Sequence, residues 1–361
     1  MPDMSAARSG EEFRDDLRPV GAVAGASAAA ARRVLNAAEL APLTTLNDAR
    51  SALAVAQTFA LIGAAIGFAL WLGPSLWLAV PIIVIGVQQH ALFILAHEAA
   101  HYRLSRRRWA NEALGRFVGI VGGVSMCTYR VIHRLHHNNL YTEEDPDTAI
   151  HGGYPRGVAY LWKKLAQDLS GWNAWKTYAY FFGAPAINRE TNRAARPLDD
   201  TSAALRAAAR ADRWWVVGFH LAAPLLLLAF FGAKGLAWYA LLWLLPLLTV
   251  LQPILRLRAI CEHGAVTDLS SPLTAARCNR TTGRRGNWLA RALLFPHHVN
   301  HHLEHHLYPA VPHYHLPRLH RLLAAKGALD GAEVRDIGST LRLVFAARAP
   351  RPATNQPVTT A

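Results

Sequence analysis

The chain contains few cysteines and few acidic residues. Three cysteines occur in 361 residues, and none of them forms a close pair such as CxxC. An odd number of scattered thiols argues against a disulfide framework and predicts unpaired, reduced cysteines. Asp and Glu total 24 against 38 Lys and Arg, which gives a formal net charge of +14. A balance this basic is typical of proteins that bind nucleic acid or an anionic membrane surface.

Charge is absent from four long stretches of the sequence. The chain is 52% hydrophobic, and uncharged apolar runs occupy residues 52–72, 76–96, 214–231 and 236–255. Runs of about 20 apolar residues predict transmembrane helices. The basic residues are scattered through the other segments and form no single stripe, which argues against nucleic-acid binding. The sequence therefore predicts an integral membrane protein that binds lipid and no nucleic acid.

The connections between the apolar runs set the expected topology. Residues 73–75 join the first two runs and residues 232–235 join the last two, so each pair forms an antiparallel hairpin. These connections carry one basic residue, Lys234, and the other Lys and Arg residues lie on the opposite side. The positive-inside rule then places both termini in the cytoplasm. The N-terminal segment contains no apolar h-region, so no cleaved signal peptide is expected.

The predicted fold is an all-α integral membrane protein. Four transmembrane helices in two hairpins carry a cytoplasmic helical cap, which is formed by the remaining segments. Residues 1–50 are expected to form a polar and Ala-rich cytoplasmic segment whose first 20 residues are disordered. Residues 51–325 form the membrane domain, and residues 326–361 form a basic segment with a disordered tail rich in Pro and Thr.

Histidine is abundant and clustered. The chain has 18 histidines, and most of them fall in HEAAH (97–101), HRLHH (133–137) and a third stretch at residues 295–320. Within each group histidines recur three or four residues apart, so their rings share one face of a helix. Imidazole is a common ligand of transition metals. All three groups lie outside the two hairpins, so the topology brings them to one face of the membrane.

The number of histidines suggests two metal ions. One metal takes about four to six ligands, and the three groups together offer more than that. Neutral imidazole suits Fe, Zn and Cu, so the residue type leaves the metal open. The third stretch also contains two overlapping frames, His298/His301/His302 and His302/His305/His306, and spacing alone does not choose between them.

The order of the three groups resembles the membrane fatty acid desaturase superfamily. HEAAH, HRLHH and HHLEHH follow one another with apolar spans between them, and the resemblance covers roughly residues 50–325. HRLHHNNLYTEEDPD is similar to the second histidine box of acyl-lipid desaturases, and HHLEHHLYPAVPHYHLPRLH is similar to the third. The resemblance implies a non-haem centre of two iron ions. It also implies an enzyme of a bacterial plasma membrane, and the positive-inside rule places its three histidine groups in the cytoplasm.

The same resemblance implies a set of site residues. His263 in CEHG matches a further histidine that many members carry after the last span. The complete expected ligand set is His97, His101, His133, His136, His137, His263, His302, His305 and His306. Carboxylates and amides that orient the imidazoles are expected at Glu98, Asp145, Asp147, Glu262, Asn300 and Glu304. The histidines outside this pattern are His297, His298 and His301, whose roles stay open, and His90, His151, His220, His313, His315 and His320.

The resemblance further implies a desaturase reaction. With O2 and electrons from an external carrier, such an enzyme removes two hydrogens from adjacent carbons of a fatty acyl chain and leaves a double bond. The sequence contains no HPGG-type haem domain, so the carrier is expected to be a separate protein. The basic cytoplasmic surface suits an acidic partner such as ferredoxin.

Three alternative functions use related features. Oxygen insertion on the same scaffold gives a lipid hydroxylase or a carotenoid ketolase or hydroxylase, and the histidine boxes do not separate these outcomes. A di-haem membrane cytochrome has its axial histidines within the spans, whereas most histidines here cluster just outside them. A metal transporter places its ligands at mid-membrane, where these runs carry no charge. The close similarity of the third box favours desaturation.

Overall fold

The computed structural model describes residues 28–142, 145–183, 186–188, 193–195, 202–282 and 287–347. Helices make up most of this part of the chain, and its strands have three residues each. The mostly helical fold predicted from the sequence is thus confirmed. The disordered segments expected over the first 20 residues and in the tail from residue 348 onward lie outside the described residues.

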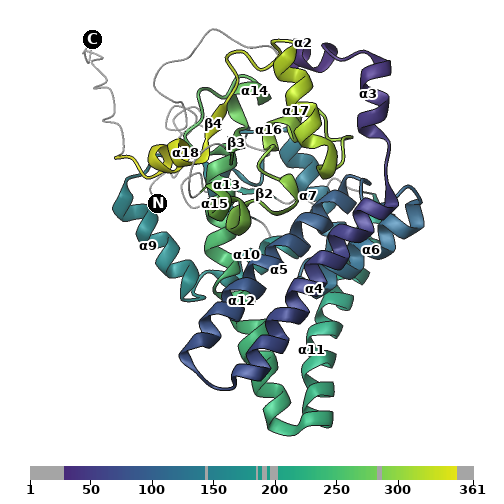
Figure 1. Ribbon diagram of the computed structural model, residues 1–361, viewed down its shortest axis with the longest axis vertical. Helices are drawn as coiled ribbons and strands as arrows, with labels where there is room; N and C mark the ends of the chain where they lie inside the picture. Colours follow the sequence, from purple (N-terminus) through teal and green to yellow (C-terminus); the bar gives the residue numbers. More distant parts are fainter. Residues whose placement is uncertain are drawn as a thin grey trace, which may run out of the picture.

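Three helical segments in the described part of the chain are long and apolar enough to cross a membrane. They are Asp48–Leu72, Leu76–Ala100 and Ala203–His263. In Figure 1 most of the length of these segments lies in the lower part of the molecule, and the third segment ends among the shorter elements above. Their length and composition agree with the expected integral membrane protein.

The first two long segments pack as a hairpin with one buried and one more exposed helix. Helix α4 (Asp48–Leu72) begins after Asn47, whose side chain accepts a hydrogen bond from the backbone N–H of Arg50. It ends at Gly73, whose φ of 63° stops the helix. The 3-10 turn η1 (Leu76–Leu78) leads into α5 (Ala79–Ala100), which is buried without interruption over residues 89–100. Helix α5 therefore forms the centre of the molecule.

The third long segment reverses direction inside its helical run. Helix α11 (Ala203–Tyr239) contains Gly232 with φ 63° and ψ −157°, a conformation that favours glycine. The chain then returns through the π-helical turn η2 (Ala240–Leu244), α12 (Leu245–Leu248) and α13 (Leu251–His263), as Figure 1 shows. A Cβ atom at Gly235 would lie 2.4 Å from the carbonyl oxygen of Leu227, so the turn requires glycine there too. The reversal occurs within the connection that the sequence indicated.

The cap contains the remaining elements. Before α11 these are α2 (Ala28–Arg33), α3 (Ala37–Thr44), α6 (Arg108–Val121), α7 (Met126–Asn138), α8 (Thr148–His151), α9 (Val158–Leu169), α10 (Ala174–Phe181), β1 (Ala186–Asn188) and β2 (Arg193–Ala195). After α13 they are α14 (Pro272–Ala275), β3 (Cys278–Arg280), α15 (Asn287–Leu294), η3 (Pro296–His298), α16 (His302–Leu307), η4 (His313–His315), α17 (Leu316–Ala325), β4 (Val334–Asp336) and α18 (Ile337–Val344). Strands β1 and β2 pair antiparallel, and β3 and β4 pair parallel.

Packing of the cap continues past residue 325, where the membrane domain was expected to end. Strand β4 pairs with β3 in the register Cys278 to Val334, and Ile337 and Val344 of α18 are buried. Helix α16 packs in one hydrophobic cluster with α17, α14 and α2. The last histidine group is therefore held from several sides by elements far apart in the sequence.

Candidate metal centre

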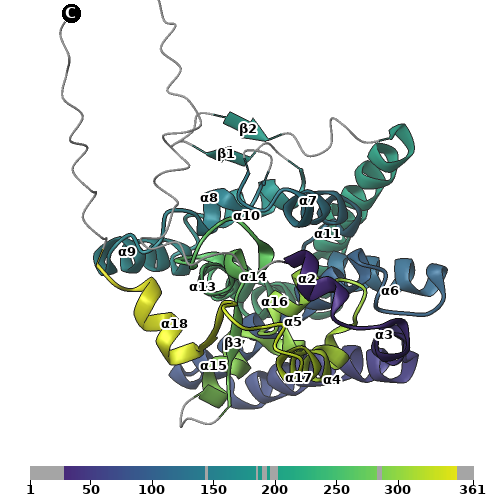
Figure 2. The same ribbon diagram turned by 90° about the horizontal axis from the view of Figure 1, so that it is seen from above.

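Four helices bring the three histidine groups together. Helix α5 contributes HEAAH at its C-terminal end, α7 contributes HRLHH, α13 ends at His263, and α16 contributes the last histidines. Figure 2, viewed from above, shows α16 in the middle of the cap and close to α5. The nine histidines expected as ligands are buried except for His101 and His137, which are half-buried. They form two adjacent groups.

The first group contains five of these histidines. One ring nitrogen from each lies within 4.8 Å of the others in the set His97, His101, His133, His137 and His305. Nε2 of His137 lies 3.0 Å from Nε2 of His133 and 3.0 Å from Nε2 of His305. Three helices thus direct nitrogens at one point.

The second group contains the other four, with one ring nitrogen from each again within 4.8 Å of the rest: His136, His263, His302 and His306. Nε2 of His263 lies 3.2 Å from Nε2 of His136 and 2.8 Å from Nε2 of His302, which is 3.1 Å from Nε2 of His306. The rings of His137 and His306 stack with centroids 4.2 Å apart, so the two groups are direct neighbours.

The hydrogen bonds of the second group fit a metal cation. His136 Nδ1 donates to Oδ1 of Asp145 at 2.9 Å, and His263 Nδ1 donates to the carbonyl oxygen of Ala275 at 3.0 Å. In the neutral rings both Nε2 atoms then present lone pairs to each other. A metal bound at ~2.0 Å from each nitrogen holds tetrahedral neighbours roughly 3.3 Å apart. The observed separations are close to that value, so the residues present fit a metal ion.

Burial keeps most of these imidazoles neutral, the form that binds a metal. It lowers the pKa of His101 to about 3 and lowers the pKa of His133 and His305 well below the usual range. His136 differs from them. Burial lowers its pKa, but the carboxylates of Asp145 and Asp147 outweigh burial and raise the pKa to about 9. The two aspartates therefore stabilise positive charge at this position, whether it comes from a proton on His136 or from a bound cation.

Four of the six groups expected to orient imidazoles face the two histidine groups. Beyond the Asp145 contact, Oδ2 of Asp147 lies 3.6 Å from Nδ1 of His136, and its other oxygen accepts a hydrogen bond from Tyr180. Oε1 of Glu98 lies 3.6 Å from Nδ1 of His97. For Glu262, Oε2 lies 3.7 Å from Nε2 of His302, and Oε1 accepts a hydrogen bond from Arg258 at 2.9 Å.

The other two expected groups face away from the nine histidines. Asn300 donates from its side chain to the carbonyl oxygen of Asn279 in β3 at 3.0 Å. The carboxylate of Glu304 lies 2.5 Å from Nδ1 of His320. The expectation that these two residues orient the ligand imidazoles does not match these contacts, because the packing of β3 and α17 against α16 takes up both side chains.

His151 is a buried residue near the site that sequence reasoning set aside. Its Nε2 lies 3.9 Å from Oδ2 of Asp145, and its ring centroid is 4.9 Å from that of His263. Ligand atoms of His136, Asp145 and His151 all lie within 4.8 Å of one another. No helical spacing links His151 to HRLHH, so the only signal in the sequence was its proximity to the acidic segment.

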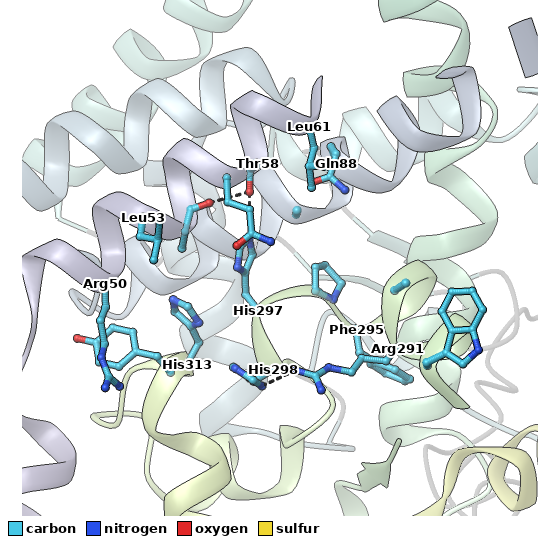
Figure 3. A pocket seen from close by; sticks show the side chains of 17 residues that line it. Arg50, Leu53, Thr58, Leu61, Gln88, Arg291, Phe295, His297, His298 and His313 are labelled. Atoms are coloured by element: carbon cyan, nitrogen blue, oxygen red, sulfur yellow. Dashed lines mark hydrogen bonds between the residues drawn. The ribbon is translucent and has the colours of Figure 1, made fainter. Parts of the chain in front are cut away.

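His297 and His298 lie outside both groups and line a groove beside α4. Its volume is about 590 Å³. Nε2 of His297 lies 3.1 Å from Oγ1 of Thr58, and Arg291 lies 3.3 Å from Nδ1 of His298. Figure 3 shows Arg50 and Arg291 on opposite sides of His298. The apolar part of the lining includes Leu53, Ala54, Leu61, Ala91 and Phe295.

Comparison with known proteins agrees with this geometry. The sequence profile of a family described as fatty acid desaturase matches residues 74–338. Dihydrorhizobitoxine desaturase of Bradyrhizobium elkanii is 28% identical over 289 residues, which cover 76% of this chain and 76% of that protein. These similarities support a desaturase-type oxidoreductase, and the matched range includes all nine histidines of the two groups. The chain belongs to the fatty acid desaturase family.

Proposed function

We propose that the protein is a membrane enzyme that binds two iron ions and uses O2 to introduce a double bond into a fatty acyl chain. The observation that carries the proposal is the division of nine histidines into neighbouring groups of five and four. Two such sets of imidazole nitrogens suit two metal ions. When bound, the iron ions supply the oxidation of an unactivated C–H bond, which side chains alone do not perform.

The neighbouring side chains and carbonyls hold the proposed ligands in place. Asp145 fixes the proton of His136 on Nδ1, so that Nε2 is free to face an ion, and the carbonyl of Ala275 does the same for His263. Glu98 and Glu262 place further carboxylates beside His97 and His302. Asp145 and the Ala275 carbonyl orient their imidazoles through hydrogen bonds, and the carboxylates together balance part of the charge of the proposed ions.

The groove beside α4 is the proposed approach path of the substrate. Its apolar lining suits methylene groups, and Arg50 and Arg291 suit an anionic group at one end of the chain. His297 and His298 have left-handed backbone conformations, with φ values of 52° and 60°. Such conformations cost energy in residues other than glycine and concentrate at functional sites.

The proposed arrangement in the membrane has four crossings. The reversal at Gly232 divides the third long segment into two arms, which together with α4 and α5 account for them. The excess of Lys and Arg outside the short connections supports a cytoplasmic location for both termini and the histidine groups. A separate acidic electron carrier would then meet the basic cytoplasmic face.

The experiment that tests the proposal also addresses an alternative reaction and an alternative substrate. Oxygen insertion would give a lipid hydroxylase or a carotenoid ketolase or hydroxylase. The similarity to a dihydrorhizobitoxine desaturase makes dihydrorhizobitoxine the second candidate substrate for desaturation.

Mass spectrometry of lipids from a bacterial host with and without the protein tests the assignment. The wild type is expected to produce acyl chains that lack two hydrogens, and H136A is expected to produce none. Acyl chains that gain an oxygen atom would show that the protein is a hydroxylase and not a desaturase. Unchanged lipids together with conversion of added dihydrorhizobitoxine would overturn the acyl substrate and keep the desaturase.

A further inference from the structure

A third group of metal-binding side chains lies next to α16 and shares no residue with the nine histidines. It consists of Cys278 in β3, His301 at the N-cap of α16, Glu304 in α16 and His320 in α17. One ligand atom from each lies within 4.8 Å of the other three. Cys278 and Glu304 are fully buried, whereas the side chains of His301 and His320 are 14% and 20% exposed.

The distances in this group fit a tetrahedral site of mixed ligands. Sγ of Cys278 lies 3.5 Å from Nδ1 of His301 and 3.8 Å from Nδ1 of His320. A zinc ion at ~2.3 Å from sulfur and ~2.0 Å from nitrogen separates the two ligand atoms by roughly 3.5 Å. Oε2 of Glu304 lies 3.8 Å from Nδ1 of His301. Oε1 of Glu304 lies closer to Nδ1 of His320, at 2.5 Å, and this distance would lengthen by about 1 Å on metal binding.

One carboxylate oxygen in the group lacks a hydrogen bond. Oε2 of Glu304 is buried and accepts no hydrogen bond from an N–H or O–H group of the described residues, although Oε1 contacts His320 and the carboxylate interacts with the Cys278 thiol. A buried acceptor without a partner is costly and indicates a missing ligand or ion. One thiolate, one carboxylate and two neutral imidazoles also neutralise the charge of one divalent cation.

We propose that Cys278, His301, Glu304 and His320 bind one zinc ion with a structural role. A four-coordinate set that includes a thiolate suits zinc better than a hard cation such as magnesium or calcium. The ion would tie β3 and α17 to the helix that carries three of the proposed iron ligands. His301 and Glu304 would thus serve the structure of α16 and stay outside the iron centre.

Zinc analysis of the purified full-length protein tests the site. The wild type is expected to contain about one zinc ion per chain in addition to iron. C278S and H320A are expected to lose that zinc, while H136A, which disrupts the proposed iron centre, keeps it. H315A serves as the matched control, because His315 is a half-buried histidine of the same region outside the group. Zinc retained in both C278S and H320A would overturn the proposal.

X-ray absorption at the zinc edge locates the ion in the wild type, so the test does not depend on variants that fold. The proposed site predicts one sulfur neighbour at ~2.3 Å and three nitrogen or oxygen neighbours at ~2.0 Å. Neither histidine group of the iron centre contains sulfur, so zinc bound there would show nitrogen and oxygen alone. That spectrum, or the absence of zinc, would contradict the proposal.

Discussion

Two buried polar regions near the C-terminal end of α13 differ in how their polar atoms are satisfied. In the group around His263, nitrogens of neighbouring histidines face one another at 2.8–3.2 Å. Around Arg277, guanidinium nitrogens meet oxygens: Nε donates to Glu333 at 2.8 Å, and Nη1 donates to the carbonyl oxygens of Cys261 and Gly264 at 3.1 and 2.9 Å.

Nitrogens that face one another without donors are typical of a ligand site, whereas the paired atoms around Arg277 are typical of a structural support. Glu333 also accepts hydrogen bonds from Arg335 and Thr267, and both Glu333 and Arg277 have fully buried side chains. This ion pair is complete within the protein. The histidine groups have converging lone pairs, which a cation satisfies. The two regions meet at the end of α13, because Arg277 binds the carbonyls on either side of the Glu262–His263 pair.

The largest effect is expected in the histidine region. H136A removes a proposed ligand and leaves Asp145 buried without its imidazole partner. Desaturation should fall below detection and the iron content should drop, while zinc stays. H315A should behave as wild type. Wild-type turnover in H136A would contradict the claim that the histidine region is the metal centre.

The Arg277 region should respond in stability. E333Q leaves the Arg277 cation buried without its charge partner, which costs roughly 3–5 kcal/mol. Chemical denaturation in detergent at pH 7 measures this loss, and the iron content per folded chain should stay at the wild-type level. A loss of less than about 1 kcal/mol in the free energy of unfolding would mean that the Arg277–Glu333 pair is as weak as a surface ion pair. That result would contradict its role as a structural support.

The pH dependence of this difference has a definite sign. Burial raises the pKa of Glu333, but Arg335 and Arg277 outweigh burial and hold it at about 2. The unfolded value is about 4.3. The ionised carboxylate therefore contributes stability above about pH 4, and this contribution is lost as the pH falls towards 2. The difference in unfolding free energy between wild type and E333Q should shrink over that range. A constant difference would show that Glu333 does not contribute through its negative charge.

A smaller effect is expected from the carboxylate that orients His136. D145N keeps the shape of the side chain and weakens the hydrogen bond to Nδ1, so iron affinity or turnover should fall about 10- to 100-fold. D330N is the matched control, because Asp330 is exposed. Iron titration of the metal-free protein measures the change. Equal affinity in D145N and D330N would show that Asp145 does not orient the ligand.

The smallest effect is expected at the groove. H298A changes a half-buried side chain outside both histidine groups, so iron content should be unchanged and stability should stay within about 0.5 kcal/mol. Its expected signature is a higher KM with an unchanged kcat, because the groove is the proposed approach path. A loss of iron would move His298 into the metal centre.

The sequence predicted the long helices and the composition of the centre better than its surroundings. Uncharged runs fix where helices cross an apolar layer, and the three-to-four-residue spacing fixes which histidines share a helix face. The choice between the frames at residues 298–306 could not come from spacing. It depends on the packing of β3 and α17 against α16, which also turns Glu304 towards His320. His151 could not be placed from spacing either, because the packing of α8 against α13 brings it next to Asp145.

Iron analysis of the wild-type protein, purified without oxygen and active on its substrate, tests the central claim most directly. Groups of five and four histidines predict about two iron ions per chain, surrounded by nitrogen and oxygen neighbours without sulfur. An active, folded protein with one iron ion or none would contradict the account.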